Sequence, residues 1–410
     1  MKIIFFEDNQ SDSLRPVSLG QPAFDIFCAA SNLYQVCQHT FKNVKIDFLI
    51  RDYLLPTARA KHQRHTGLDN KILLLNGSLI PSYTHAQTLY KKIKSLKDNQ
   101  GCILQCKQQT IGALIYINNQ SQIKKLKANK VIKYLAKLDY KKVKILWPIF
   151  NHLYELITYN QKILGDNLKF IKNGYQQFQK NVYIGKQIKL SEQINFDASD
   201  GPIIIDDYSQ IQPFSYLKGP LYIGKNCLIK EFSSIKNSSI GPVCRIGGEI
   251  ESSIIQGYSN KQHYGFVGHS YIGQWVNIAA GATISDLKNT YGQIKMDGKN
   301  TKKQLMGCII GDYSKISTNT NLFAGKIIGI NSFLYGNITN DVSSFTNVGS
   351  WLEKKVSIPL PIAIKTQKLV FARRSKKQTK RDIKLLENIY QLTAQNRRQQ
   401  KINQGKVSFI

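Results

Sequence analysis

The second half of the chain repeats apolar residues at intervals of six, and this period constrains the fold more than any other feature of the sequence. Six residues fit neither an α-helix, with about 3.6 residues per turn, nor plain strand alternation. They fit a solenoid whose coils have three flat sides, each turning one apolar side chain inward, and whose coils bury these side chains by stacking. The repeating positions are Ile184, Leu190, Phe196, Ile205, Ile211, Leu217, Ile223, Ile229, Ile235, Ile310, Ile316, Leu322, Ile328 and Leu334.

We therefore predict a hexapeptide-repeat parallel β-helix over residues 182–345, in the left-handed form that is usual for such repeats. Many of the repeating residues precede glycine, as in YIGK, IIGD and IIGI. Glycine at these places would supply a positive φ at a corner, or make room where a Cβ would clash.

The remaining regions show other patterns. Residues 1–145 alternate strand-like runs (MKIIFF, KIDFLI, NKILLLNGSLIP) with helical stretches such as 85–96, which predicts an α/β domain. The segment 146–181 is expected to be a helical connector. Residues 346–410 form a basic C-terminal tail, in which the prolines of IPLPIAI are expected to break structure. Helical spacing follows from Lys365 onward, with Ile383, Leu386, Ile389 and Leu392 apolar.

Composition narrows the class of protein. The net charge of +31 invites a nucleic-acid interpretation, but the charge is concentrated only in the tail, so no specific nucleic-acid partner is expected. No apolar run approaches the length of a membrane span, and the N-terminus lacks the apolar core of a secretory signal. The seven cysteines are scattered without a framework of pairs, which favours the reducing cytoplasm.

One stretch carries a specific resemblance: IGPVCRIGGEIESSIIQGYSNKQHYGFVGHSYIGQWVNIAAGATISDLKNTYG. With the repeats around it, the chain resembles the GlmU-like family of bifunctional N-acetylglucosamine-1-phosphate uridyltransferases and glucosamine-1-phosphate acetyltransferases. It is most similar to the divergent sugar nucleotidyltransferase subgroup with a hexapeptide C-terminal half. The resemblance implies a Rossmann-like nucleotidyltransferase domain over residues 1–145, a homotrimer, and acetyl-CoA, a nucleoside triphosphate and a sugar phosphate as small-molecule partners.

Acetyl transfer from a thioester to a sugar amine needs a base and a donor for the thioester oxygen. His263 lies at the offset of the family's catalytic histidine, five residues before the glycine of a hexapeptide turn, whereas His269 is on the turn itself and is interpreted as a surface or stacking residue. By resemblance, Asn277 holds the amino sugar and the backbone N–H near Ala280 stabilises the oxyanion.

The resemblance also suggests binding residues for the coenzyme and the sugar. Phe266 stands where the family has a tyrosine that contacts substrate, and Thr318 matches a position that contacts coenzyme A. Lys288, Asn289 and Tyr291 form a candidate cradle for phosphate and sugar. A polar loop that merely protrudes from a coil is the structural alternative for that cluster.

The N-terminal region matches the nucleotidyltransferase signature only in part. Arg15 can take the place of the signature arginine, although the glycine-rich loop before it is absent and Gln21 replaces a lysine. With Arg15, Asn76 is the other candidate nucleotide-binding residue. It belongs to LLLNGS, which resembles the strand end LNGD, but Ser78 replaces the aspartate that binds Mg²⁺ in the family. Mg²⁺ therefore stays a possible cofactor for nucleotidyl transfer only.

Three functions follow from these features. The first is a cytoplasmic transferase of sugar-nucleotide and cell-wall biosynthesis, which acetylates an amino-sugar phosphate. Its N-terminal half is either an active nucleotidyltransferase that makes a UDP- or dTDP-sugar or a degenerate form of one. The second is a non-catalytic, trimeric scaffold that binds sugar nucleotides. The third, a nucleic-acid-binding protein, depends on charge alone.

Overall fold

The computed structural model of the chain describes residues 1–62, 69–96, 100–116, 126–350 and 355–405. These residues form two compact units. The first contains residues 1–26 and 31–152, and the second contains residues 27–30 and 153–410. Among the described helices, none is long and apolar enough to cross a membrane.

The first unit is built on a six-stranded sheet with the order β2-β1-β3-β5-β4-β6. Its strands are β1 (Lys2–Phe6), β2 (Lys45–Leu49), β3 (Lys71–Asn76), β4 (Cys102–Cys106), β5 (Gln109–Tyr116) and β6 (Lys141–Lys144). Its helices are α1 (Leu33–Thr40), α2 (Leu55–Lys61), α3 (Tyr83–Lys94) and α5 (Val131–Leu135). β1 runs parallel to β2 and β3, whereas β5 is antiparallel to β3 and β4. β1 is buried along its whole length, as expected for a central parallel strand.

The second unit begins with helix α6 (Tyr154–Ile171), which packs on the β-helix. Asn160 is fully buried there, and its side-chain oxygen accepts hydrogen bonds from the Ala29 N–H (2.8 Å) and the Ser239 hydroxyl (2.7 Å). An antiparallel pair, β7 (Gln176–Gln179) and β8 (Val182–Ile184), then leads into the first coil.

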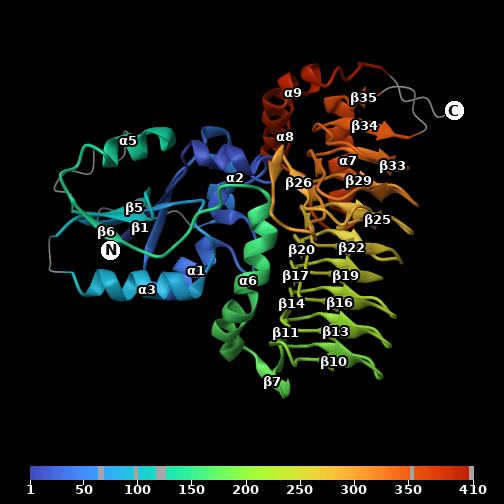
Figure 1. The fold of residues 1–410 in the computed structure, drawn as a ribbon, viewed down its shortest axis with the longest axis horizontal. Coiled ribbons are helices and arrows are strands. Elements are labelled where there is room, and N and C mark those ends of the chain that lie inside the picture. The colour runs from blue at the N-terminus through green and yellow to red at the C-terminus, as the bar shows by residue number, and fades with distance from the viewer. Residues whose placement is uncertain (63–68, 97–99, 117–125, 351–354, 406–410) are drawn as a thin grey trace. The chain divides into compact units, whose positions relative to one another are not determined.

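The β-helix has three faces of stacked strands, which pair in parallel except for the last strand of face 2, β35, which is antiparallel to β34 (Figure 1). Face 1 contains β8, β11 (Ile203–Ile205), β14 (Leu221–Ile223), β17 (Ser239–Ile240), β20 (Ile254–Ile255), β23 (Tyr271–Ile272), β28 (Ile309–Ile310) and β31 (Ile327–Ile328). Face 2 contains β9 (Lys189–Leu190), β12 (Gln210–Ile211), β15 (Leu228–Ile229), β18 (Arg245–Ile246), β21 (Asn260–Lys261), β24 (Asn277–Ile278), β29 (Lys315–Ile316), β32 (Phe333–Tyr335), β34 (Thr346–Gly349) and β35 (Val356–Ser357). Face 3 contains β10 (Asn195–Asp197), β13 (Tyr216–Lys218), β16 (Ser234–Lys236), β19 (Glu249–Glu251), β22 (Phe266–Gly268), β25 (Thr283–Ile284), β30 (Asn321–Leu322) and β33 (Asn337–Ile338). The predicted left-handed β-helix is confirmed.

The repeating apolar residues form the core of this prism. Ile205, Ile211 and Leu217, one on each face, are all fully buried. Burying one such side chain contributes about 1.5–3 kcal/mol, so the stacked rows are the main source of stability in this unit. Serine hydroxyls inside the corners bridge neighbouring coils: the Ser253 Oγ accepts from the Ser270 N–H (3.0 Å) and donates to the Glu251 carbonyl (2.7 Å).

The glycines after the face 1 strands serve only one of the two predicted purposes. Gly224 has no positive φ, but a Cβ there would lie 2.9 Å from the backbone carbon of Gly241 in the next coil. The left-handed positions of the same corner are filled by ordinary residues such as Asn226, with φ of 57°. Close approach of neighbouring coils, rather than backbone conformation, therefore requires glycine here.

The tail adds helices α7 (Leu360–Ala372), α8 (Lys380–Leu392) and α9 (Ala394–Gln399) to the second unit. The expectation that IPLPIAI breaks structure is wrong, because Pro361 lies in the first turn of α7, where the missing N–H costs no hydrogen bond. Phe371 at the end of α7 packs on Trp275 with ring centres 4.5 Å apart. In α8, Leu386 and Ile389 are buried as predicted, whereas Leu392 is exposed.

Candidate functional site

Three predicted residues lie on one edge of the prism, the edge where the chain passes from face 2 to face 3. His263, Ala280 and Thr318 occupy this edge in three successive coils. The Gly281 N–H donates to the Tyr264 carbonyl (3.1 Å), and the Asn319 N–H donates to the Ala280 carbonyl (2.9 Å), so the three corners are stacked directly. We call this row the acyl edge.

The groups on the acyl edge are open for interaction. The side chains of His263 and Thr318 are exposed. The Ala280 N–H donates no hydrogen bond within the part of the chain that the structure describes. An exposed imidazole beside an unused backbone donor can take a proton and stabilise an oxyanion, provided that a substrate lies between them.

Lys261 supports the His263 corner from inside the prism, and the sequence analysis missed it. It occupies an inward position between Ile246 and Ile278 of the neighbouring coils, and it is only 1% exposed. Its ammonium group donates to the carbonyls of His263 (2.6 Å) and Gly247 (3.0 Å). Burial lowers the pKa of Lys261 to about 8. A lysine six residues before Val267, in step with the apolar period, was the signal available in the sequence.

The buried ammonium predicts a pH-dependent stability difference. Because the folded-state pKa of Lys261 is about 8, below the ordinary value of 10.5, its charge opposes folding most below pH 8, and this cost disappears as pH rises toward 10.5. Relative to Lys261→Met, the wild-type free energy of unfolding should gain about 2 kcal/mol between pH 7 and pH 10. Urea unfolding of both proteins at the two pH values measures the difference. A constant difference between them would contradict a buried charge.

A second predicted group lies on the edge where face 3 passes to face 1. His269 Nδ1 lies 2.6 Å from Asp286 Oδ2, and both residues are buried. Gly268 makes this pairing possible, because a Cβ there would overlap the Asp286 carboxylate and press on the Phe266 ring. His269 is therefore an ordered partner of a carboxylate rather than a simple surface residue.

The predicted phosphate and sugar cradle protrudes from this second edge. Lys288, Asn289 and Tyr291 belong to an excursion between β25 and β28 that also contains the hairpin β26 (Lys295–Met296) and β27 (Lys299–Asn300). Lys288 donates to the Gln293 carbonyl within the loop (2.9 Å), whereas Asn289 and Tyr291 are exposed. The structure thus brings His263, Ala280 and Thr318 to one edge, and Phe266 and the cradle to the neighbourhood of the other.

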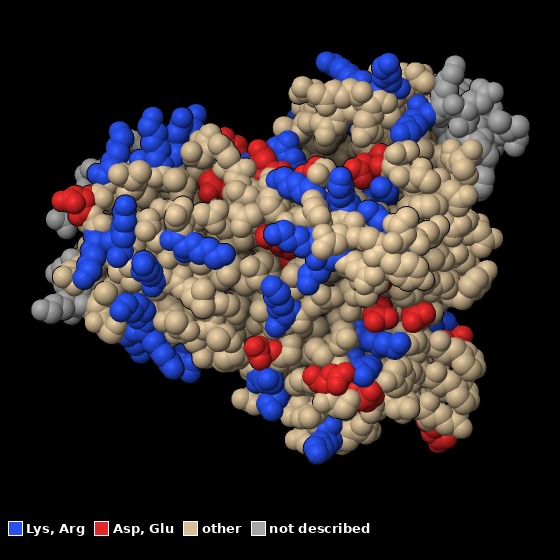
Figure 2. All heavy atoms as spheres, viewed as in Figure 1, with Lys and Arg blue, Asp and Glu red and all other residues tan. Residues whose placement is uncertain are grey.

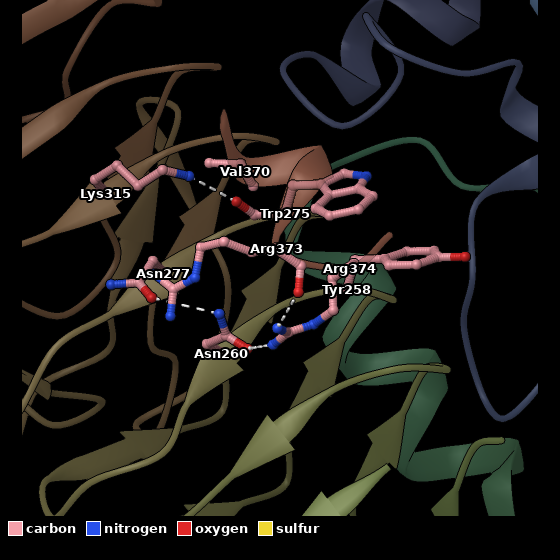
Figure 3. A pocket seen from close by; sticks show the side chains of 8 residues that line it. All are labelled: Tyr258, Asn260, Trp275, Asn277, Lys315, Val370, Arg373 and Arg374. Atoms are coloured by element: carbon pink, nitrogen blue, oxygen red, sulfur yellow. Dashed lines mark hydrogen bonds between the residues drawn. The ribbon is translucent and has the colours of Figure 1, made fainter. Parts of the chain in front are cut away.

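Asn277 lies on the outer side of β24 in face 2. It is therefore on a face of the prism and on neither of the two edges just described. It is in register with Asn260 below and Lys315 above. Together with α7 these residues line a pocket of about 150 Å³ (Figure 3). The lining consists of Tyr258, Asn260, Trp275, Asn277, Lys315, Val370, Arg373 and Arg374. The Arg374 guanidinium donates to Asn260 Oδ1 (2.6 Å), and the Lys315 ammonium donates to the Trp275 carbonyl (2.8 Å).

In the first unit, the predicted nucleotide residues lie near the carboxyl ends of β1 and β3. Asn76 is fully buried and donates from its side-chain nitrogen to Asp8 Oδ2 (2.9 Å). Burial raises the pKa of Asp8. Arg15 is partly exposed and forms an ion pair with Asp12 (2.7 Å). Ser78 is buried, and its N–H donates to Asn76 Oδ1 (2.8 Å).

Two features near this strand edge were missed by the sequence analysis. Glu7 directly follows β1 and is buried against Arg51, with Arg51 Nη2 2.9 Å from Glu7 Oε1, and Asp8 is the next residue. The acidic pair directly after a buried strand was the available signal. No group of three or more His, Cys, Asp or Glu side chains that could hold a metal occurs in the described ranges, and Mg²⁺ stays a prediction.

Comparison with known proteins agrees with the family resemblance. Residues 3–176 match the family described as sugar nucleotidyl transferase. The chain is similar to the bifunctional protein GlmU of Clostridium beijerinckii, with 26% identity over 215 residues, which is 49% of this chain and 40% of that protein. It is also similar to GlmU of Buchnera aphidicola, with 31% identity over 145 residues, which is 34% of this chain and 28% of that protein. The predicted likeness to a divergent GlmU-like family is thereby confirmed, and the matches span less than half the length of these relatives.

Among solved structures, the UDP-N-acetylglucosamine acyltransferase from Campylobacter jejuni matches 50% of this chain and 94% of its own, with 11% identity and a TM-score of 0.22. The polysialic acid O-acetyltransferase OatWY matches 42% of this chain and 88% of its own, with 16% identity and a TM-score of 0.21.

Proposed function

We propose that the protein is a cytoplasmic transferase of sugar-nucleotide biosynthesis. Its β-helix transfers an acetyl group from acetyl-CoA to the amine of an amino-sugar phosphate, and its first unit joins a nucleotide to a sugar phosphate to give a UDP- or dTDP-sugar. The observation that carries the proposal is the combination, in one chain, of a sugar nucleotidyl transferase match with a β-helix edge that presents His263, Ala280 and Thr318 in consecutive coils.

On the acyl edge, His263 accepts the proton that the sugar amine loses as its nitrogen attacks the thioester carbonyl carbon. The Ala280 N–H donates to the oxygen that gains charge in this step. A C–N bond forms, the C–S bond breaks, and the coenzyme leaves as a thiolate that recovers the proton. Lys261 keeps the His263 corner in place through its bond to the His263 carbonyl.

The coenzyme is proposed to lie along the acyl edge beside Thr318, against the β-helix of a neighbouring copy in a homotrimer. Exposed aromatic side chains support an interface there, because Phe214 and Phe232 occupy the same edge in earlier coils and stack with ring centres 5.1 Å apart. Apolar side chains of this size at a surface are typical of protein contacts. Light scattering on the purified chain tests the trimer, and a fully active monomer would contradict it.

The acetyl-transfer proposal is tested with acetyl-CoA and glucosamine 1-phosphate. Release of free thiol that requires both substrates, together with N-acetylated product, is the expected result. Binding of sugar nucleotides without any thiol release, for a panel of amino-sugar phosphates, would favour the scaffold. That alternative has one supporting observation, namely that Arg15 is engaged with Asp12 rather than free.

Nucleotidyl transfer by the first unit is proposed to depend on Arg15. A guanidinium bound to a nucleotide phosphate contributes about 1.5–3 kcal/mol as a charge-assisted hydrogen bond. Arg15→Ala should therefore lower pyrophosphate release from a nucleoside triphosphate and a sugar 1-phosphate by about 10-fold to 100-fold. Arg59→Ala, in the last turn of α2, is the matched control and should match the wild-type rate. Unchanged pyrophosphate release in Arg15→Ala would remove this residue from the site.

A further inference from the structure

The pocket between face 2 and the end of α7 contains an unusual set of charges. Lys315, Arg373 and Arg374 all line it, and no Asp or Glu belongs to its lining among the described residues (Figure 3). On the face drawn in Figure 2, Lys and Arg side chains are spread over many elements, with Asp and Glu among them. Three cations around one cavity without a carboxylate are therefore a local feature, and they do not follow from the basic composition alone.

The hydrogen bonds that these cations make leave much of their capacity unused. Lys315 donates to one backbone carbonyl, that of Trp275. Arg374 donates to Asn260 and to the Arg373 carbonyl (3.2 Å), but its Nε is buried without a partner. The Arg373 side chain has no hydrogen bond or ion pair to the described residues. A buried unpaired donor costs about 1–3 kcal/mol, which a bound acceptor would recover.

Burial, and after it mutual repulsion, disfavours the protonated forms of Lys315 and Arg374. Burial, and to a smaller extent the Arg373 guanidinium, lowers the pKa of Lys315 to about 7. Burial, followed by the guanidinium groups of Arg245 and Arg373, lowers the pKa of Arg374. Arg245 lies one coil below Asn260 on the same outward row of face 2. An anion in the pocket would be stabilised by all of these charges.

We propose that this pocket binds the phosphate group of a substrate. Its volume of about 150 Å³ is well above the roughly 10–15 Å³ that one water molecule needs, so the pocket has room for a group larger than water. The guanidinium group of Arg373 and the ammonium group of Lys315 supply the charge, and the amides of Asn260 and Asn277 supply further donors. The stacked rings of Tyr258 and Trp275, 4.3 Å apart, form the wall beside them.

Phosphate binding in this pocket does not depend on the proposed acetyl transfer. Only the identity of the molecule that carries the phosphate rests on that function. One source is the phosphate of the amino-sugar acceptor. The other is the phosphate groups of coenzyme A. Both present the same chemistry to the pocket, so the binding experiment distinguishes them by the carrier that gains affinity over inorganic phosphate.

Binding is measured by calorimetry on the full chain with inorganic phosphate, glucosamine 1-phosphate, coenzyme A and 3′-dephospho-coenzyme A, without any turnover. Arg373→Ala and Lys315→Met should each weaken the binding of phosphate compounds by about 10-fold or more, because each removes one charge-assisted contact. Lys377→Ala is the matched control, since Lys377 is an exposed cation of the same segment that does not line the pocket. It should leave the affinity within about twofold of the wild type.

Each result decides one point. Arg373-dependent binding in which glucosamine 1-phosphate exceeds inorganic phosphate assigns the pocket to the acceptor. A loss of affinity from coenzyme A to its dephospho form, present in the wild type and absent in Arg373→Ala, assigns it to the coenzyme. Equal affinities in Arg373→Ala, Lys315→Met and Lys377→Ala would overturn the proposal. A chain that binds phosphate through Arg373 but never releases thiol would keep this site and reject the acetyl transfer.

Discussion

Replacing His263 by glutamine is expected to lower the turnover of acetyl transfer by about 10³-fold, the middle of the range for loss of a general base. Glutamine keeps a polar side chain of similar size on the exposed corner but cannot accept the amine proton at neutral pH. The corner itself should persist, because Lys261 holds it through the backbone carbonyl of residue 263. Coenzyme A affinity should therefore stay close to that of the wild type. Thiol release and calorimetry on the same preparations separate the two quantities.

His269→Gln is the control on the opposite edge of the same coil. Because His269 faces Asp286 rather than the acyl edge, its replacement should reduce turnover by less than about 10-fold, through loosened packing only. Retained activity in His263→Gln together with a 10³-fold loss in His269→Gln would reverse the assignment. The base would then be an imidazole oriented by a carboxylate, an arrangement that enzymes use elsewhere.

The β-helix was predictable because its determinant is local and repeated. Each inward residue, such as Ile211 or Leu322, sits at a position fixed by the period of six, and each is buried at 0–1% exposure. The period was lost between residues 236 and 309, where inward positions include Ile240, Ile246, Ile250 and Ile255, at intervals of six, four and five. Shortened corners, such as Gly247–Gly248 between β18 and β19, cause these irregular intervals.

The irregular intervals in this region also hid the fact that the predicted site residues lie on two different edges of the prism. His263 and His269 are six residues apart, which in this fold places them on successive corners rather than on one surface. Sequence proximity therefore suggested a single cluster. The pocket on face 2 depends on Arg373 and Arg374, about a hundred residues from Asn277, and on a helix that was expected to begin after a break. Only the folded chain brings these residues together.

In the first unit, the strands β1, β2 and β3 were predictable, but β4, β5, β6 and the polar contacts were not. β1 and β3 correspond to the apolar runs MKIIFF and KILLLN, and both are largely buried. The pairing of Asn76 with Asp8 joins residues separated by 68 positions, and it depends on the parallel register of these strands. No local pattern encodes that register, so Asp8 had no visible partner in the sequence.

The second large effect expected is on stability, at Gly265 in the His263 corner. Gly265 has a φ of +120°, which side chains rarely adopt, and a Cβ there would overlap the Ala282 carbonyl oxygen of the next coil. Because backbone atoms cannot move aside independently, Gly265→Ala should cost about 4 kcal/mol, the level at which single substitutions become exceptional. The unfolding temperature of the β-helix unit should fall by roughly 10 °C, which calorimetry measures.

Gly174→Ala provides the matched control, since a Cβ at Gly174 meets no atom within 4 Å and the residue has no positive φ. Its effect should stay within about 0.5 kcal/mol, as for most surface substitutions. Equal unfolding temperatures for the two alanine variants would mean that the coils around His263 separate freely. In that case Ala280 and His263 would not be held in fixed relation, and an acyl edge that requires no reorganisation during the reaction would lose its physical basis.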